Sequence, residues 1–213
     1  PLWDIGTYLH PLFKAYPYIN LWGERNSGKT KVMLLSSKIS FNPIMVSDIT
    51  PSVIFRVVDQ NSCTLYFDEA ERLFDDKSTK NDDTSEIVSL LNAGWQQGSS
   101  AVRMEKQGEK FEPLFFDSYS PKMIASIAGI KGALDSRSIS IIMLRARKDD
   151  VKGDSEPDDY DSYQYIRDLL YPLVLKNWRT IKENYSGLGV NKVFKISNRD
   201  WQIWKPLLSI AKE

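Results

Sequence analysis

Residues 18–30 read YINLWGERNSGKT, a short apolar run followed by a loop bounded by two glycines and ending in Lys-Thr. This glycine loop, residues 23–30, matches the pattern G-x-x-x-x-G-K-S/T at every position. Gly23 and Gly28 let the backbone curl until successive N–H groups face one anion. A helix that begins at Lys29 would add the positive end of its dipole. The flanking strand and helix favour a phosphate-binding loop over a chance match in a surface loop.

Two side chains of the glycine loop have predicted roles beside a nucleoside triphosphate. The Lys29 ammonium would contact the β- and γ-phosphates, and the Thr30 hydroxyl would bind the metal ion. The sequence therefore predicts ATP and Mg²⁺ as cofactors. The predicted nucleotide-binding residues of the loop are Gly23, Glu24, Arg25, Asn26, Ser27, Gly28, Lys29 and Thr30.

A second acidic motif follows residues 63–67, a nearly continuous apolar run that ends in Asp68-Glu69. Such a run is typical of a parallel strand buried on both faces. As in the Walker B pattern, Asp68 would hold Mg²⁺ against Thr30, and Glu69 would polarise the water that attacks the γ-phosphate. Acidic residues also favour the first turn of a helix, which is the alternative interpretation. The order of the two motifs favours a catalytic pair.

Composition limits the classes of function that remain. The chain has 213 residues, 42% of them hydrophobic and 26% charged, and its formal net charge is +0. It has no apolar run near the roughly 18 residues of a membrane span and no secretory signal pattern, so we expect a cytoplasmic location without membrane contact. Since the chain opens at Pro1, we expect a piece of a longer protein. Zero net charge argues against simple coating of nucleic acid, but an oligomer can still present a few basic residues in a central channel.

The single cysteine and single histidine exclude further chemistry. Cys63 has no partner for an internal disulfide, which fits a reducing compartment. Together with His10 it is too little for the usual zinc sites, and His10 alone is left for a Ser-His-Asp triad. His10 lies in an amphipathic segment, so we predict a structural role for it.

The pattern of apolar runs and helical periodicity predicts an α/β fold: a parallel five-stranded sheet flanked by helices, followed by a small C-terminal helical region. The predicted strands are residues 18–22, 44–46, 63–67, 123–127 and 138–144. The predicted helices are residues 3–14, 29–39, 51–58, 70–74, 85–95, 163–183 and 199–212. The predicted domains are an ATPase core with a lead-in helix at 1–148, an acidic linker at 149–160 and a lid-like helical region at 161–213.

A hairpin is predicted from strands 101–105 and 111–115, with glycine in the turn between them. It carries Lys106 and Lys110 near its tip.

Two polar residues near other strands are further candidates for the nucleotide site. Arg137, at the start of the last strand, is a candidate to contact the γ-phosphate held by a neighbouring subunit, and an ion pair with Asp135 or another acid is the alternative. Ser126, at the end of the fourth strand, is a candidate sensor of the γ-phosphate or a small residue chosen for packing.

Four blocks together resemble an AAA+-type P-loop ATPase: residues 23–30, 65–70, 91–94 and 134–139. The chain is most similar to an ATPase family found in phage and plasmid replication proteins, often fused to primases. It is similar in plan to superfamily 3 and minichromosome-maintenance helicases. The resemblance extends to residues 198–201 and 204–211, and so covers most of the chain.

The resemblance implies ring assembly, for instance as a hexamer, and ATP-driven translocation on DNA during replication of a mobile genetic element. Arg137 matches the position of the arginine finger, and Arg199 corresponds to a sensor 2 arginine or is a simple surface charge. The sensor 1 position, usually asparagine, falls on Ser126 or Ala128 here. Lys106 and Lys110 would contact DNA from a pore hairpin, or are an ordinary solvated hairpin tip.

The predicted function is therefore a Mg²⁺-dependent, ring-forming ATPase motor of the helicase type. The alternative is an AAA+ remodeller or loader that acts on a protein partner, for which Trp95, Trp201 and Trp204 are possible contact residues. Aromatic residues in the hairpin, Phe111 and Phe115, leave both open. A P-loop kinase is the least favoured class, because it needs neither Glu69 as a water activator nor an arginine from a neighbour.

Overall fold

The computed structural model describes residues 2–46, 50–74, 82–108, 110–146, 160–189, 196 and 198–212. Its centre is a sheet of five strands in the order β2-β3-β6-β1-β7, and every pairing in this sheet is parallel. The strands are β1 (Tyr18–Trp22), β2 (Pro43–Val46), β3 (Thr64–Phe67), β6 (Lys122–Ser126) and β7 (Ser138–Ile142). The predicted α/β fold with a parallel five-stranded sheet is confirmed, and each strand lies within two residues of its predicted bounds.

The position of each strand in the sheet follows from its sequence. β3 and β6 are buried at every residue, and β1 at all but its last, as expected of strands covered on both faces. β2 and β7 are the outer strands, and each buries one residue only. The most apolar runs therefore occupy the middle of the sheet.

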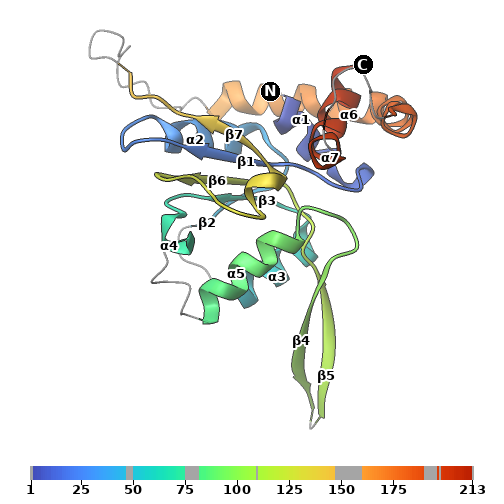
Figure 1. Cartoon of the computed structure of the whole chain (residues 1–213). Coiled ribbons are helices and arrows are strands. Elements are labelled where there is room, and N and C mark those ends of the chain that lie inside the picture. Colours follow the sequence, from blue (N-terminus) through green and yellow to red (C-terminus); the bar gives the residue numbers. More distant parts are fainter. Residues whose placement is uncertain are drawn as a thin grey trace.

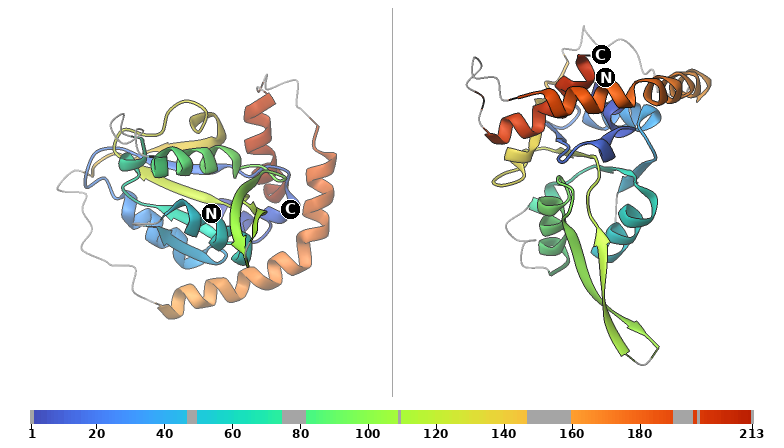
Figure 2. Two further views of the ribbon diagram at one scale, coloured as in Figure 1. Left: turned by 90° about the horizontal axis from the view of Figure 1, so that it is seen from below. Right: turned by 90° about the vertical axis from the view of Figure 1, so that its right-hand side faces the viewer.

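Helices cover both faces of the sheet (Figures 1 and 2). One face carries α1 (Leu2–Thr7), α2 (Lys29–Ile39), α6 (Tyr160–Gly187) and α7 (Asn198–Ala211). The other carries α3 (Pro51–Asn61), α4 (Glu71–Phe74) and α5 (Asp82–Ala93). Side chains alternate along each strand. Tyr66 therefore packs in the core on the face of α1 and α2, whereas Leu65 and Phe67 pack in the core on the face of α3 and α5. The described elements thus form a three-layer α/β arrangement.

The predicted lead-in helix over residues 3–14 is wrong in its length. α1 ends at Thr7, and a separate 3-10 turn, η1, covers His10–Leu12. Pro11 is the physical reason, because it has no N–H to donate to the carbonyl of Thr7, four residues earlier. The ring Nδ1 of His10 bonds that carbonyl instead, at 2.9 Å.

The predicted hairpin is confirmed. β4 (Ser100–Gln107) and β5 (Lys110–Asp117) form a separate antiparallel pair that projects away from the sheet (Figures 1 and 2). Phe116 at its base is buried in the core between α3 and α5, and Ala101 and Leu114 pack against that core. Only the base of the hairpin is therefore held by the body of the protein.

The C-terminal helical region packs directly on the core. Ile203 of α7 joins the core on one face of the sheet, and Ile181 of α6 joins the core on the other with Leu207 and Ile210. Most of the predicted linker at 149–160 lies outside the described residues. None of the helices in the described ranges is long and apolar enough to cross a membrane.

Candidate functional site

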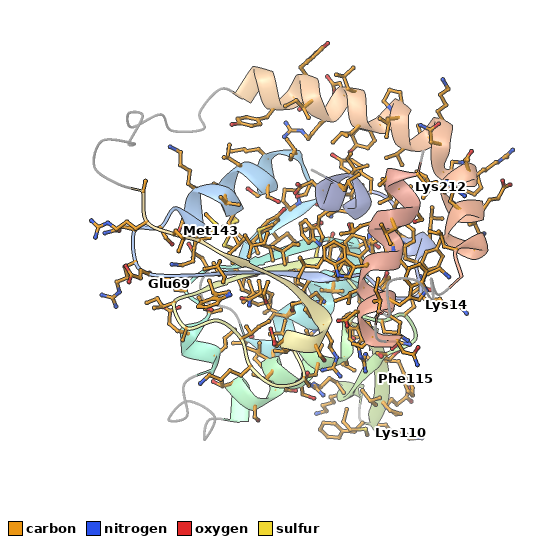
Figure 3. All side chains as sticks on the ribbon, turned by 45° about the horizontal axis from the view of Figure 1, so that its top comes forward. Lys14, Glu69, Lys110, Phe115, Met143 and Lys212 are labelled. Carbon is orange, nitrogen blue, oxygen red and sulfur yellow. The ribbon has the colours of Figure 1, made fainter. Side chains whose placement is uncertain are left out.

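Both predicted motifs lie at the carboxyl end of the sheet. The glycine loop connects β1 to α2, and Asp68 and Glu69 directly follow β3. β6 lies between β1 and β3, so the two motifs face each other across the end of that strand. Glu69 and Met143 mark this end in Figure 3, while Lys14 marks the amino end of the sheet. Parallel pairing therefore brings together residues that are 38 positions apart, Thr30 and Asp68.

The backbone of the glycine loop depends on its glycines. Gly23 has a φ of 153°, and a Cβ there would lie 2.1 Å from the carbonyl oxygen of Met143. Gly28 has a φ of 87° and Asn26 a φ of 62°, both in the left-handed region. Gly28 also caps α2 without a side chain, so the first N–H groups of the helix open toward the loop. This concave backbone, at the start of an 11-residue helix, suits an anion.

Lys29 turns back over the loop. Its Nζ donates to the carbonyl oxygens of Gly23 at 2.7 Å and Glu24 at 2.8 Å, and lies 3.4 Å from the Ser27 hydroxyl. The ammonium group is thus held at the concave side of the loop by neutral acceptors. A phosphate oxygen is a stronger acceptor for it, because that hydrogen bond is charge-assisted.

Thr30 and Asp68 form the contact between the motifs. The Thr30 hydroxyl donates to Oδ2 of Asp68 at 2.9 Å, and Oδ1 of Asp68 accepts the backbone N–H of Glu69 at 2.9 Å. A hydroxyl and a carboxylate side by side are ligands that fit Mg²⁺, which takes one or two protein groups together with phosphates and water. These two residues are therefore the ones that would hold the ion.

Glu69 has a φ of 50°, an unusual conformation for a residue other than glycine, and its side chain is exposed. It lines a pocket of about 620 Å³ that contains both motifs. The pocket is lined by Arg25, Asn26, Lys29, Thr30, Asp68, Glu69, Glu71, Ala125 and Ile127. Sequence reasoning missed Glu71, one of whose carboxylate oxygens is buried without a hydrogen bond among the described residues. The sequence feature that could have identified Glu71 is its position two residues after Glu69, at the start of α4.

Ser126 ends β6 beside Trp22 of β1, but its neighbours Ala125 and Ile127 line the pocket. The Ser126 hydroxyl is buried and has no hydrogen-bond partner in the described part of the chain. Because successive side chains of a strand point to opposite faces, the Ser126 side chain points away from the face on which Ala125 and Ile127 lie. A sensor role for Ser126 stays a prediction, and packing remains its alternative.

Arg137 and Arg199 lie elsewhere, at the amino end of the sheet. Arg137 precedes β7, whose first residue pairs with Tyr18 at the start of β1. Its guanidinium donates to the side-chain oxygen of Asn92, whereas Asp135 accepts a bond from Ser140 at 3.2 Å. The ion pair considered between Arg137 and Asp135 is therefore not formed. Arg199, at the start of α7, stacks on Trp95 in the same region.

The hairpin lysines point to different faces of the ribbon. Lys106 pairs with Phe111, and Lys110 pairs with Gln107, so the two lysines occupy alternate positions of the ladder. The face of Lys106 carries exposed apolar side chains, namely Val102, Met104, Phe111, Pro113 and Phe115. The face of Lys110 carries Glu112, and nearer the base Arg103 pairs there with Glu86. The spatial separation of Lys106 and Lys110 could not be read without the strand register.

His10 and Cys63, for which the sequence predicts no catalytic role, are both buried. Burial lowers the pKa of His10 to about 4, so its ring is neutral near pH 7. Burial raises the pKa of Cys63 to about 11.

Trp95 and Trp201, which the sequence analysis considered as contacts for a protein partner, are buried. Of the three tryptophans considered there, Trp204 is the accessible one, with 42% of its surface exposed. That interpretation is therefore wrong for Trp95 and Trp201.

Comparison with protein-family models and with curated proteins gives no match to this chain.

Proposed function

We propose that this chain is a Mg²⁺-dependent ATPase that works as an assembled motor on DNA. One observation carries the proposal: Thr30 and Asp68, from the two motifs, meet at 2.9 Å inside the pocket that also contains Lys29 and Glu69. A phosphate-binding loop and an acidic pair at the carboxyl ends of two strands in one parallel sheet are the parts of a site for a nucleoside triphosphate and its metal.

The chain's own residues would divide the chemistry as follows. Lys29 would exchange its carbonyl acceptors on Gly23 and Glu24 for oxygens of the β- and γ-phosphates. Thr30 and Asp68 would hold Mg²⁺, which neutralises charge that develops on the phosphates. Glu69, exposed in the pocket, would orient a water molecule and accept its proton.

Arg137 would act on a second subunit. It lies one strand length from the glycine loop of its own chain, since β1 separates the two and its five residues span roughly 16 Å. An arginine finger from a neighbour supplies charge stabilisation that a single chain lacks. Repetition of such a head-to-tail contact gives a ring where the rotation between subunits closes, and this is the expected homo-oligomer.

DNA is the proposed substrate because the hairpin projects from the ATPase body and carries Lys106 and Lys110 toward its end. In this proposal the chain is the helicase-type module of a mobile element's replication protein, with a primase as a fused or associated partner. The exposed apolar face of the hairpin favours a second candidate, a remodeller or loader acting on a protein, because apolar contacts are how proteins recognise each other.

ATP hydrolysis, measured over a range of protein concentrations with and without single-stranded DNA, tests the proposal. We expect the rate per subunit to rise with protein concentration and with DNA, and Arg137→Ala to abolish it. Hydrolysis that requires assembly but ignores DNA would move the assignment to the protein remodeller. A rate per subunit that is independent of concentration and of Arg137 would contradict the assembled motor.

A further inference from the structure

Two arginines share one aromatic platform at the amino end of the sheet. The guanidinium carbon of Arg199 lies 4.6 Å from the centre of the Trp95 ring, and that of Arg137 lies 5.8 Å from it. Arg137 comes from the turn before β7, Arg199 from α7 and Trp95 from the segment after α5. Trp95 is itself fixed, because it is buried and its carbonyl accepts the backbone N–H of Tyr16 at 2.9 Å.

Among the described residues, no carboxylate is paired with either arginine of this pair. Arg137 is bonded to the neutral amide of Asn92, and its Nε is buried without a partner among the described residues. Burial and the neighbouring Arg199 both lower the pKa of Arg137. Two like charges held close together by stacking are stabilised by an anion between them.

The chain's own nucleotide pocket cannot supply that anion. The pocket lies at the carboxyl end of the sheet and the arginine pair at the amino end, with the length of β1 between them, roughly 16 Å. Because no described carboxylate pairs with either guanidinium, the anion to consider is one from another molecule. The fork of N–H donors on a guanidinium matches the oxygens of a phosphate group, and two guanidiniums can grip one group from two sides.

We propose that Arg137 and Arg199 form a single phosphate-binding site, held on Trp95, for the ATP that a second copy of the chain binds in its glycine loop. This inference rests on the proposed function and extends it, because it places Arg199 in the neighbour's site and not in its own. Arg199 is then a second arginine finger. Nucleic-acid phosphate is the other source of the same chemistry, and the test separates the two.

Mixing of variants tells a neighbour's arginine from a subunit's own. Arg199→Ala keeps its glycine loop, and Lys29→Ala keeps both arginines, so each protein alone lacks one half of every site. In a random 1:1 mixture, about one interface in four joins an intact loop to an intact arginine pair. We expect Arg199→Ala alone to lower the hydrolysis rate by roughly 10- to 100-fold, less than a full arginine finger. We expect the mixture to recover up to about a quarter of the wild-type rate.

Two controls accompany the mixture. Arg137→Ala mixed with Lys29→Ala should recover activity in the same way, because both arginines serve one site. Arg179→Ala removes an exposed arginine that stacks on Trp178 at 5.2 Å on α6, and it should hydrolyse ATP like the wild type. Loss of folding in Arg199→Ala cannot produce recovery, because the active interfaces use the glycine loop of that variant.

Each other outcome overturns the inference. If only the Arg137→Ala mixture recovers, Arg199 serves its own subunit or the packing of α7. If Arg199→Ala hydrolyses ATP normally but binds a labelled single-stranded oligonucleotide less tightly in fluorescence anisotropy, the phosphate belongs to nucleic acid. If neither mixture recovers while the wild type is active, neither arginine acts across an interface. A wild type that is inactive at every concentration contradicts the proposed function as well.

Discussion

The two ends of the sheet differ in what their polar groups contact. At the carboxyl end, Thr30 meets Asp68 in a pocket bordered by loops, and most of the glycine loop is exposed. At the amino end, Lys122 is completely buried and its Nζ donates to the carbonyl oxygens of Gly94, Ser118 and Ser120 at 3.0–3.1 Å. The carboxyl end has space for a ligand, whereas the polar groups around Lys122 at the amino end are satisfied by contacts within the chain.

The amino end connects the hairpin to the arginine pair. Lys122 joins Ser118, which follows β5, to Gly94, which follows α5. Asn92, two residues before Gly94, holds Arg137. The Nζ of Lys122 also lies 5.0 Å from the ring centre of Tyr18 at the start of β1. These contacts connect the hairpin and Arg137 to the sheet, so in the proposed function both would keep their position while the carboxyl end binds and releases its ligand.

Loss of Lys29 is expected to have the largest effect, because it removes the one ammonium group at the concave side of the glycine loop among the described residues. Lys29→Ala should lower ATP hydrolysis by at least about 100-fold and weaken binding of a fluorescent ATP analogue. Lys31→Ala, two positions along α2 and exposed, is the matched control and should retain activity. Equal losses in both variants would mean that general charge, and not a site, attracts the nucleotide.

Two glycine substitutions compare the two ends directly through unfolding in urea without ligand. A Cβ on Gly94 would lie 2.2 Å from the carbonyl oxygen of Ser118, whereas a Cβ on Gly28 meets nothing within 4 Å. We expect Gly94→Ala to lower the free energy of unfolding by about 3 kcal/mol or more. Gly28→Ala should cost about 1 kcal/mol, from its positive φ alone. A reversed order would contradict the contrast between the two ends.

Stability should depend on pH through Lys122. Burial lowers its pKa from 10.5 to about 7 in the folded protein. Between pH 7 and 10 the unfolded chain therefore holds a proton that the folded protein has released, so the free energy of unfolding rises with pH. This contribution is complete above pH 10.5 and is lost as pH falls toward 7. Relative to Lys122→Met, the wild type should gain at most about 1.4 kcal/mol per pH unit in this window. Parallel curves for the two proteins would show that Lys122 stays protonated in the fold.

The smallest expected effect separates the two faces of the hairpin. Lys106 shares its face with Phe111 and Phe115, whose rings can stack on bases, while Lys110 shares its face with Glu112. Lys106→Ala should reduce the stimulation of hydrolysis by single-stranded DNA a few-fold, and Lys110→Ala should change it little. Basal hydrolysis should be the same in both variants. Unchanged stimulation in Lys106→Ala would remove this face from the DNA-binding proposal.

Local sequence was sufficient wherever one segment forms one element. The strands, most helices and the hairpin follow from apolar periodicity, and the glycine loop from its pattern of residues. Prediction was wrong at one local signal, which helical periodicity obscured, and at one position that a distant contact decides. Pro11 ends the lead-in helix early, because it cannot donate to Thr7. Trp95 was predicted as a contact residue for a protein partner, but it is buried in the core between α5 and the sheet.

The sequence by itself determined an α/β chain with a glycine loop after one buried strand and an acidic pair after another, because these features depend on neighbouring residues. The motifs also predicted that Asp68 and Thr30 would share a metal ion, and strand order places the two side chains in contact. Only the tertiary structure decided the other arrangements: strand register separates Lys106 from Lys110, and helix packing brings Arg199 beside Arg137 on Trp95. These arise from burial of the whole chain in one arrangement, and no local pattern in the sequence encodes them.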